Sequence, residues 1–344
     1  MNKYLVVLKG ENKLFATREF ESLWDIYFNQ KITLKQLQNT LYFFESEFLL
    51  DSNCILLKRL TFTNIISLVL YEDETLVNLL NSIQYEKISF SDNFTFSVIS
   101  KFFSEQKEEN KVLAKPIWDN LKNPKVNLKN PDYIFNYFGV DLNENKSLFF
   151  LSKQLYENNK DYLLRMPKLR PIKRPYTLKA DMARAAINLL GLKEGEVLLD
   201  PFCGIGGILL EGYDMSLDIK GNDISKVDLD LLKENFEFFY PNAKYELTQF
   251  DCSKEFGEEN SVDGIVTDIP YGRACRKLGD NLYEEFFKNA KRLLKPNKKM
   301  VIIYANFNSA KDLALKYFNE DVEITEYINK SMTRHILVLI NNKD

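Results

Sequence analysis

The chain has 344 residues, 45% of them hydrophobic and 28% charged, which is long enough for about two or three globular units. A formal net charge of −3 at pH 7 does not by itself favour a nucleic-acid-binding protein. With one histidine and four cysteines that lack CxxC spacing, no metal site is expected. No apolar run approaches about 18 residues, and the N-terminus has no signal-peptide cleavage site, so we expect a cytoplasmic protein.

In the first 175 residues, strand-like and helical segments occur in mixed order. Hydrophobic alternation predicts strands at residues 3–9, 41–48, 54–60, 64–71 and 94–99. Apolar spacing of three and four predicts helices at residues 14–29, 74–84 and 107–121. Residues 127–176, rich in Pro, Asn, Lys and Arg, are predicted to form a lead-out and linker. This order indicates small α+β units rather than a long parallel sheet.

After residue 175 the predicted strands are separated by segments of helix length. The predicted helices are residues 180–190, 206–216, 226–238, 281–294 and 309–318. The predicted strands are residues 196–200, 218–223, 245–250, 262–268, 299–305, 321–329 and 334–340. This alternation predicts an α/β fold with a mostly parallel sheet, which binds ligands at the carboxyl ends of its strands.

A glycine-rich turn follows the strand that ends at Asp200. Gly204, Gly206 and Gly207 allow a ligand to approach the backbone closely, and the helix that follows offers its unpaired amides. The dinucleotide fingerprint GxGxxG would require glycine where this chain has Leu209. The turn therefore favours a nucleoside cofactor other than NAD.

Carboxylates stand at the ends of three successive predicted strands. Asp200 can balance an amino group or a sulfonium ion, and Asp223 can accept both ribose hydroxyls of an adenosine. Asp251 can accept from the adenine amino group, with Cys252 beside the ring. Together with the glycine turn, these positions predict S-adenosylmethionine as the cofactor.

The fourth predicted strand ends in the sequence DIPYG. An exocyclic amine is a poor nucleophile, and two acceptors that bind its N–H groups favour a more nucleophilic geometry. Asp268 supplies one acceptor and the carbonyl group of Ile269 the other, while Pro270 stiffens the turn. Tyr271 offers a flat face on which a flipped base can stack. The motif predicts methyl transfer to a base amino group, which needs mainly alignment of the reacting atoms.

Two stretches are locally basic. Residues 111–129 contain five lysines and one acid, and residues 165–184 contain seven basic residues and one acid. Such stretches can bind a polyanion through one face, although solvated linker charges are the alternative. The candidate RNA contacts in the second stretch are Lys168, Arg170, Lys173 and Arg174.

These motifs resemble those of the THUMP-domain tRNA guanine-N2-methyltransferases, specifically the archaeal type that acts on guanine 10. The resemblance extends over nearly the whole chain, from VVLKGENKLFATREF near the N-terminus through VNLKNPDY to RMPKLRPIKRPYTLKADMARAAINLL. Its most specific parts are DPFCGIGGILLEG and TDIPYGR. Gly206 and Gly207 resemble the guanine-10 group more than the guanine-6 relatives.

The resemblance implies a C-terminal Rossmann-like, seven-stranded methyltransferase domain preceded by small α+β domains. It places a ferredoxin-like domain at residues 1–60, a THUMP RNA-binding domain at 61–158, a linker at 159–178 and the methyltransferase domain at 179–344. The expected product is N2-methylguanosine, with N2,N2-dimethylguanosine after a second transfer. The expected partner is tRNA, and we expect the protein to act alone, with a small activator subunit as the alternative.

The motifs and the resemblance together assign two further sets of residues. The cofactor-binding set is Asp200, Phe202, Gly204, Gly206, Asp223, Ile224, Asp251, Cys252, Tyr176 and Thr177. Arg273 is assigned to the RNA or the substrate pocket.

The chain departs from the family at two places. Ile269 replaces the usual proline; because its carbonyl group remains, the chemistry is expected to survive, and Ile269→Pro is expected to be tolerated. Where the family usually has Pro-Phe-Phe in the linker, this chain has Pro175-Tyr176-Thr177.

The alternatives to this function are a guanine-6 enzyme, a DNA-adenine or protein-glutamine methyltransferase, a non-catalytic RNA-binding paralogue and an NAD oxidoreductase. A covalent cysteine mechanism is disfavoured because neither Cys252 nor Cys275 follows a proline.

Overall fold

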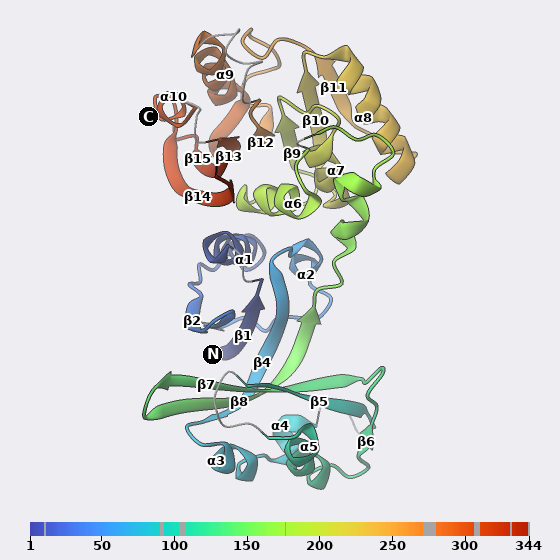
Figure 1. Cartoon of the computed structure of the whole chain (residues 1–344), viewed down its shortest axis with the longest axis vertical. Helices are drawn as coiled ribbons and strands as arrows, with labels where there is room; N and C mark the ends of the chain where they lie inside the picture. The colour runs from blue at the N-terminus through green and yellow to red at the C-terminus, as the bar shows by residue number, and fades with distance from the viewer. Residues whose placement is uncertain are drawn as a thin grey trace. The chain divides into compact units, whose positions relative to one another are not determined.

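The computed structural model describes residues 1–9, 12–89, 93–102, 108–175, 177–270, 280–305, 310–330 and 332–342. The chain divides into two compact units, which we describe separately (Figure 1). Unit 1 comprises Met1–Thr17, Lys31–Lys58 and Phe62–Asn159. Unit 2 comprises Arg18–Gln30, Arg59–Thr61 and Lys160–Asp344. Within the described residues, no helix has the length and apolar character that crossing a membrane requires.

Unit 1 is built on an eight-stranded mixed sheet with the strand order β2-β3-β1-β4-β8-β7-β5-β6. Its strands are β1 (Asn2–Leu8), β2 (Lys35–Gln38), β3 (Leu41–Ser46), β4 (Thr63–Asp73), β5 (Thr95–Phe102), β6 (Lys125–Val126), β7 (Tyr133–Asn143) and β8 (Lys146–Glu157). The strands pair in antiparallel fashion, except that β5 is parallel to both β6 and β7.

The helices of the N-terminal half are α1 (Lys13–Phe28), α2 (Ile55–Arg59), α3 (Leu76–Asn81), α4 (Tyr85–Ile88) and α5 (Asn110–Asp119). Leu79 of α3 and Ile117 of α5 pack with Phe135 of β7 in the larger core cluster of unit 1. Phe138, which points to the opposite face of β7, lies in a second, smaller cluster with Phe150 of β8. The central strands of this sheet are therefore apolar on both faces.

Two predictions for this half are wrong. Residues 54–60, predicted as a strand, contain helix α2, because the buried Leu56, Leu57 and Leu60 have helical spacing rather than alternation. Residues 127–176, predicted as a linker, contain strands β7 and β8 near the middle of the sheet. The Pro- and Lys-rich composition belongs to the segments that flank this hairpin, and it obscured the aromatic strands between them.

Unit 2 contains a seven-stranded sheet with the order β11-β10-β9-β12-β13-β15-β14. Its strands are β9 (Val197–Asp200), β10 (Asp218–Asp223), β11 (Glu246–Gln249), β12 (Val262–Asp268), β13 (Leu294–Ala305), β14 (Asn319–Asn329) and β15 (Met332–Ile340). β9 to β13 pair in parallel, and β15 is antiparallel to β13 and β14. The predicted Rossmann-like seven-stranded fold is confirmed.

Helices cover both faces of this sheet (Figure 1). They are α6 (Ala180–Leu189), α7 (Gly207–Asp214), α8 (Lys226–Phe239), α9 (Asp280–Leu293) and α10 (Ala310–Ala314), after the short 3-10 turns η1 (Asp161–Arg165) and η2 (Pro167–Leu169). α9 and α10 share a core cluster with Leu199 of β9. α7 approaches the other face so closely that a Cβ atom on Gly212 would lie 2.6 Å from the side chain of Leu198.

Candidate active site at the carboxyl ends of the strands

A tight turn joins β9 to α7 at the carboxyl edge of the sheet. Gly206, the residue before α7, has φ +85°, a left-handed conformation that L side chains rarely adopt. A Cβ atom there would also lie 2.7 Å from the side chain of Leu232 in α8. Only glycine therefore fits this position, where it lets the turn pack against α8.

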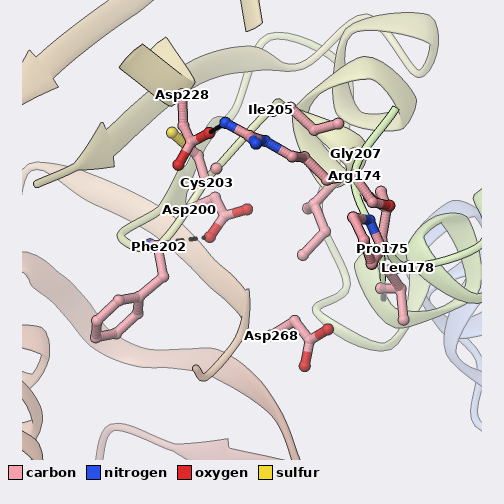
Figure 2. Close-up of a pocket in the computed structure, with 13 residues that line it drawn as sticks. Arg174, Pro175, Leu178, Asp200, Phe202, Cys203, Ile205, Gly207, Asp228 and Asp268 are labelled. Carbon is pink, nitrogen blue, oxygen red and sulfur yellow. Dashed lines mark hydrogen bonds and ion pairs between the residues drawn. The ribbon is translucent and has the colours of Figure 1, made fainter. Parts of the chain in front are cut away.

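A cavity of about 270 Å³ lies against this turn (Figure 2). Its walls come from the linker, the glycine turn, the first turn of α8 and the end of β12. The lining residues are Arg174, Pro175, Thr177, Leu178, Asp200, Phe202, Cys203, Gly204, Ile205, Gly207, Ile208, Asp228 and Asp268. The structure thus gathers at one edge residues that are almost 100 positions apart in the sequence.

Two carboxylates, those of Asp200 and Asp268, dominate the electrostatics of this cavity (Figure 2). Asp200 is 1% exposed, and its Oδ1 accepts hydrogen bonds from Thr267 Oγ1 at 2.7 Å and from the amide of Phe202 at 3.2 Å. Burial raises its pKa to about 7. Burial likewise raises the pKa of Asp268 to about 7, against the opposing positive charge of Arg334.

Asp268 is the carboxylate of the two whose hydrogen-bonding capacity is less fully used. Its Oδ1 is buried and has no hydrogen-bond partner among the described residues. A buried acceptor without a donor costs free energy, so a ligand that brings an N–H group to this oxygen would be favoured. The cavity is therefore suited to a cationic ligand together with an amine donor.

The predicted ribose ligand, Asp223, fixes the local backbone. Its Oδ2 accepts from the amide of Gly204 at 2.8 Å, and its Oδ1 accepts from the amide of Ser225 at 2.8 Å. Burial raises its pKa. Each carboxylate oxygen has a second acceptor position, so these bonds leave room for hydroxyl donors. Ile224, next in sequence, is 65% exposed and can cover a flat ligand.

Asp251 and Cys252 follow β11 at the same edge. Asp251 Oδ1 accepts from the amide of Ser253 at 3.0 Å and from its hydroxyl group at 2.7 Å. Cys252 is buried, its carbonyl oxygen accepts from Asn289 Nδ2, and burial raises the pKa of its thiol to about 12. Burial also raises the pKa of Cys203. Neither thiol is set up as a nucleophile, which agrees with the expectation against a covalent mechanism.

The turn after β12 is held on both sides. The amide of Ile269 donates to the carbonyl of Ile303 in β13 at 2.9 Å, and the Ile269 side chain is fully buried. The carbonyl of Pro270 accepts from Tyr283 Oη of α9 at 2.5 Å. The expectation that Ile269→Pro would be tolerated considered only the carbonyl group, whereas this N–H is also used, so the substitution would remove a hydrogen bond of the turn. Tyr271 lies outside the described residues.

The linker supplies a second wall. Thr177 lines the cavity, and its hydroxyl group donates to the carbonyl of Arg174 at 2.9 Å. The Arg174 guanidinium extends to Asp228 of α8 and forms an ion pair with an Nη2–Oδ1 distance of 2.9 Å (Figure 2). Lys168 and Lys173 are exposed, as an RNA contact requires. Tyr176 and Arg273 lie outside the described residues.

Arg170 does not fit its predicted role in RNA binding. It is only 1% exposed, and its Nε donates to the carbonyl of Arg165 at 2.9 Å. Arg165 and Arg184 are also buried, and both pair with Glu211 and with Asp214. Three of the seven basic residues in the second basic stretch therefore belong to the interior of unit 2, where carboxylates of α7 pair with two of them.

Sequence reasoning missed Asp228, Thr267 and Tyr283. Thr267 bonds Asp200, Asp228 pairs with Arg174 at the cavity, and Tyr283 bonds the turn after β12. Thr267 begins the TDIPYGR motif, but no local signal gave any of the three a role, because each acts on a partner that is not its neighbour in sequence. The expectation of no metal stays a prediction, although the described residues contain no group of three or more His, Cys, Asp or Glu side chains that could hold a metal ion.

Comparison with known proteins covers both halves of the chain. A family model described as an RMKL-like methyltransferase domain matches residues 167–334. The crystal structure of TrmN from Thermus thermophilus is similar over 98% of this chain and 99% of that chain, with a TM-score of 0.53 and 16% sequence identity. At that identity the likeness concerns the fold alone.

Three sequence relatives share one description. A tRNA (guanine(10)-N2)-dimethyltransferase from Methanothermobacter thermautotrophicus is 30% identical over 56% of this chain, and one from Methanocaldococcus jannaschii is 32% identical over 63%. The matched parts span 57% and 60% of the lengths of those relatives. A probable tRNA (guanine(10)-N2)-dimethyltransferase from Methanothermococcus thermolithotrophicus is 38% identical over 46% of this chain and 96% of its own length. The chain belongs to the tRNA (guanine(10)-N2)-dimethyltransferase family.

Proposed function

We propose that this protein methylates the exocyclic N2 of guanine 10 in tRNA, using S-adenosylmethionine, to give N2-methylguanosine and then N2,N2-dimethylguanosine. The observation that carries the proposal is the buried, unpartnered Oδ1 of Asp268 in the same cavity as Asp200. The relatives named above support the substrate, and the fold supports the reaction class.

The residues at the carboxyl edge fit S-adenosylmethionine. This cofactor carries a cationic sulfonium group, an α-amino group, a carboxylate and an adenosine. Asp200, which lines the cavity and is almost fully buried, would offer negative charge to the cationic groups. Asp223 would accept the ribose hydroxyls, with Ile224, Asp251 and Cys252 about the adenine ring.

S-adenosylmethionine supplies an electrophilic methyl group when it is bound. The guanine amino nitrogen would take up this methyl group, with a nitrogen–carbon bond forming as the sulfur–carbon bond breaks. Asp268 Oδ1 would accept one N–H of the amine, and the carbonyl of Ile269 the other, which aligns the nitrogen lone pair. The nitrogen becomes positively charged and releases a proton, for which Asp268, with a pKa near 7, is a suitable acceptor.

The N-terminal half would bind tRNA. We assign residues 1–60 to a ferredoxin-like domain, 61–158 to a THUMP domain, 159–178 to the linker and 179–344 to the methyltransferase domain. The exposed Lys168 and Lys173 would contact the phosphate backbone, and Arg174 would do so only after leaving Asp228. Because tRNA-type RNA is the expected substrate of this module, the proposal favours RNA over DNA or protein as the methyl acceptor.

The experiment uses the purified full chain without other proteins, S-adenosylmethionine and a tRNA transcript with guanine at positions 6 and 10. Mass mapping of the digested RNA should find one and then two added methyl groups at guanine 10. A transcript with adenine at position 10 should gain none. Methylation at guanine 6 would assign the protein to the guanine-6 enzymes, one of which is 25% identical over 46% of this chain. Cofactor binding without methylation, whether from a non-catalytic paralogue or from a chain that needs an activator subunit, would overturn the proposal that this chain methylates tRNA by itself.

A further inference from the structure

Tyr283 of α9 contacts the turn that carries Asp268. Its hydroxyl group donates to the carbonyl of Pro270 at 2.5 Å, and the residue is 6% exposed within the core cluster that also contains Ile269. α9 packs against the sheet face on which this cluster lies. Tyr283 therefore reaches the turn from the interior of the unit rather than from the cavity, whose lining residues do not include it among those described.

The turn has one fixed point at each end. At the first, the amide of Ile269 bonds the carbonyl of Ile303 at 2.9 Å, which continues the ladder between β12 and β13 past Asp268. At the second, the carbonyl of Pro270 is bound by Tyr283. The proline ring fixes φ of Pro270, so φ and ψ of Ile269 and ψ of Pro270 are the only soft backbone torsions between the two points.

The carbonyl group of Ile269 lies between these fixed points. Its direction depends on ψ of Ile269, which the following proline restricts to the extended region and which the two hydrogen bonds fix further. The Asp268 carboxylate precedes the first point, and its Oδ1 has no hydrogen bond to a described residue that could hold it in place. The backbone is thus what aims the two acceptors at one amine.

We propose that Tyr283 is a positioning residue for methyl transfer: through the Pro270 carbonyl, it fixes the direction of the Ile269 carbonyl relative to Asp268. This inference rests on the proposed function, because it assigns a task to the same two acceptors. A small misalignment of reacting groups lowers a rate steeply, whereas binding of the cofactor and of tRNA depends on other parts of the protein. Tyr283 consequently acts on the chemical step.

The test compares Tyr283→Phe with Tyr304→Phe. Tyr304 belongs to the same core cluster, is 4% exposed, and donates its hydroxyl hydrogen to Glu323 at 2.6 Å instead of to the turn. Single-turnover rates with saturating tRNA and cofactor should fall about tenfold in Tyr283→Phe and less than about twofold in Tyr304→Phe. The KM values for both ligands should stay within about twofold of wild type, and both variants should unfold at similar temperatures.

A double-mutant cycle separates positioning from a general loss of stability. In the Asp268→Asn background, Tyr283→Phe should lower the rate by less than about threefold, because the two acceptors act as a unit. An equal loss in both backgrounds, or a Tyr283→Phe rate that matches Tyr304→Phe, would overturn the inference while leaving the proposed function intact. A wild-type protein that transfers no methyl group in the same assay would overturn both.

Discussion

Replacing Asp268 by asparagine tests the centre of the proposed mechanism with little change in shape. The buried Oδ1 of Asp268 has no described partner, so its hydrogen bond to the guanine amine would be charge-assisted and made in the reacting complex. Removing one preorganised group of this kind lowers a rate by about 100-fold or more. We therefore expect the single-turnover rate of Asp268→Asn to fall about 100-fold, or about 2.7 kcal/mol in the activation free energy, and that of Asp268→Ala further.

The pH dependence of the reaction gives an independent test of the role of Asp268. Burial raises the pKa of Asp200 and of Asp268 to about 7, so both carboxylates lose their charge as the pH falls through 7. The kcat/KM for S-adenosylmethionine should accordingly rise between about pH 6 and pH 8, because ionised Asp200 would balance the cationic cofactor and ionised Asp268 would act on the amine. In Asp268→Asn the rise should be shallower, since only Asp200 still titrates there.

The folding stability of Asp268→Asn controls for a loss of rate that arises from unfolding. A carboxyl group whose pKa is raised in the folded state makes folding less favourable as pH rises from its ordinary value of 3.8 toward 7. Asp268→Asn lacks this penalty, so its free energy of unfolding at pH 8 should equal or exceed that of wild type in urea denaturation. Calorimetry should find S-adenosylmethionine and tRNA bound nearly as in wild type. Turnover close to wild type in Asp268→Asn or Asp268→Ala would refute the reasoning and require another group to orient the amine.

The remaining predictions address the cofactor, the turn and the RNA. Asp223→Ala should weaken S-adenosylmethionine binding at least about tenfold, since it loses two hydrogen bonds to a charged group; unchanged calorimetric affinity would remove Asp223 from the ribose site. Ile269→Pro deletes the N–H that bonds the buried carbonyl of Ile303, which should lower the free energy of unfolding by about 1–3 kcal/mol in urea, and wild-type stability would contradict that account. Replacing Lys168 and Lys173 with alanine should weaken tRNA binding and flatten its salt dependence without altering cofactor affinity; an unchanged salt slope in filter binding would place the RNA elsewhere.

Sequence alone determined most of the methyltransferase unit. After residue 175 its strands and helices mostly alternate, and alternation of that kind has one common solution, a parallel sheet with helices on both faces. The positions of Asp200, Asp223 and Asp268 at strand ends followed from the same pattern, because parallel strands end at one edge. The structure explains why the turn needs glycine at position 206: its positive φ and its close approach to α8 exclude a side chain.

In unit 1 the sequence was less informative. Composition suggested a linker at residues 127–176, yet the aromatic segments of β7 and β8 form the middle of a sheet. Local patterns report whether a segment can be a strand, but pairing partners far along the chain decide where it lies. Strand β7 is apolar on both faces because Phe135 and Phe138 pack into different core clusters, and only the tertiary structure shows that both clusters exist.

Tertiary structure also decided the state of individual charges. Arg165, Arg170 and Lys173 look alike in the sequence, but the two arginines are buried while Lys173 is exposed. Glu211 lies on α7, 46 residues after Arg165, and no local rule connects them. Burial likewise raises the pKa of Asp268 to about 7. Desolvation depends on every element packed around a group, so these properties arise only when the chain has folded.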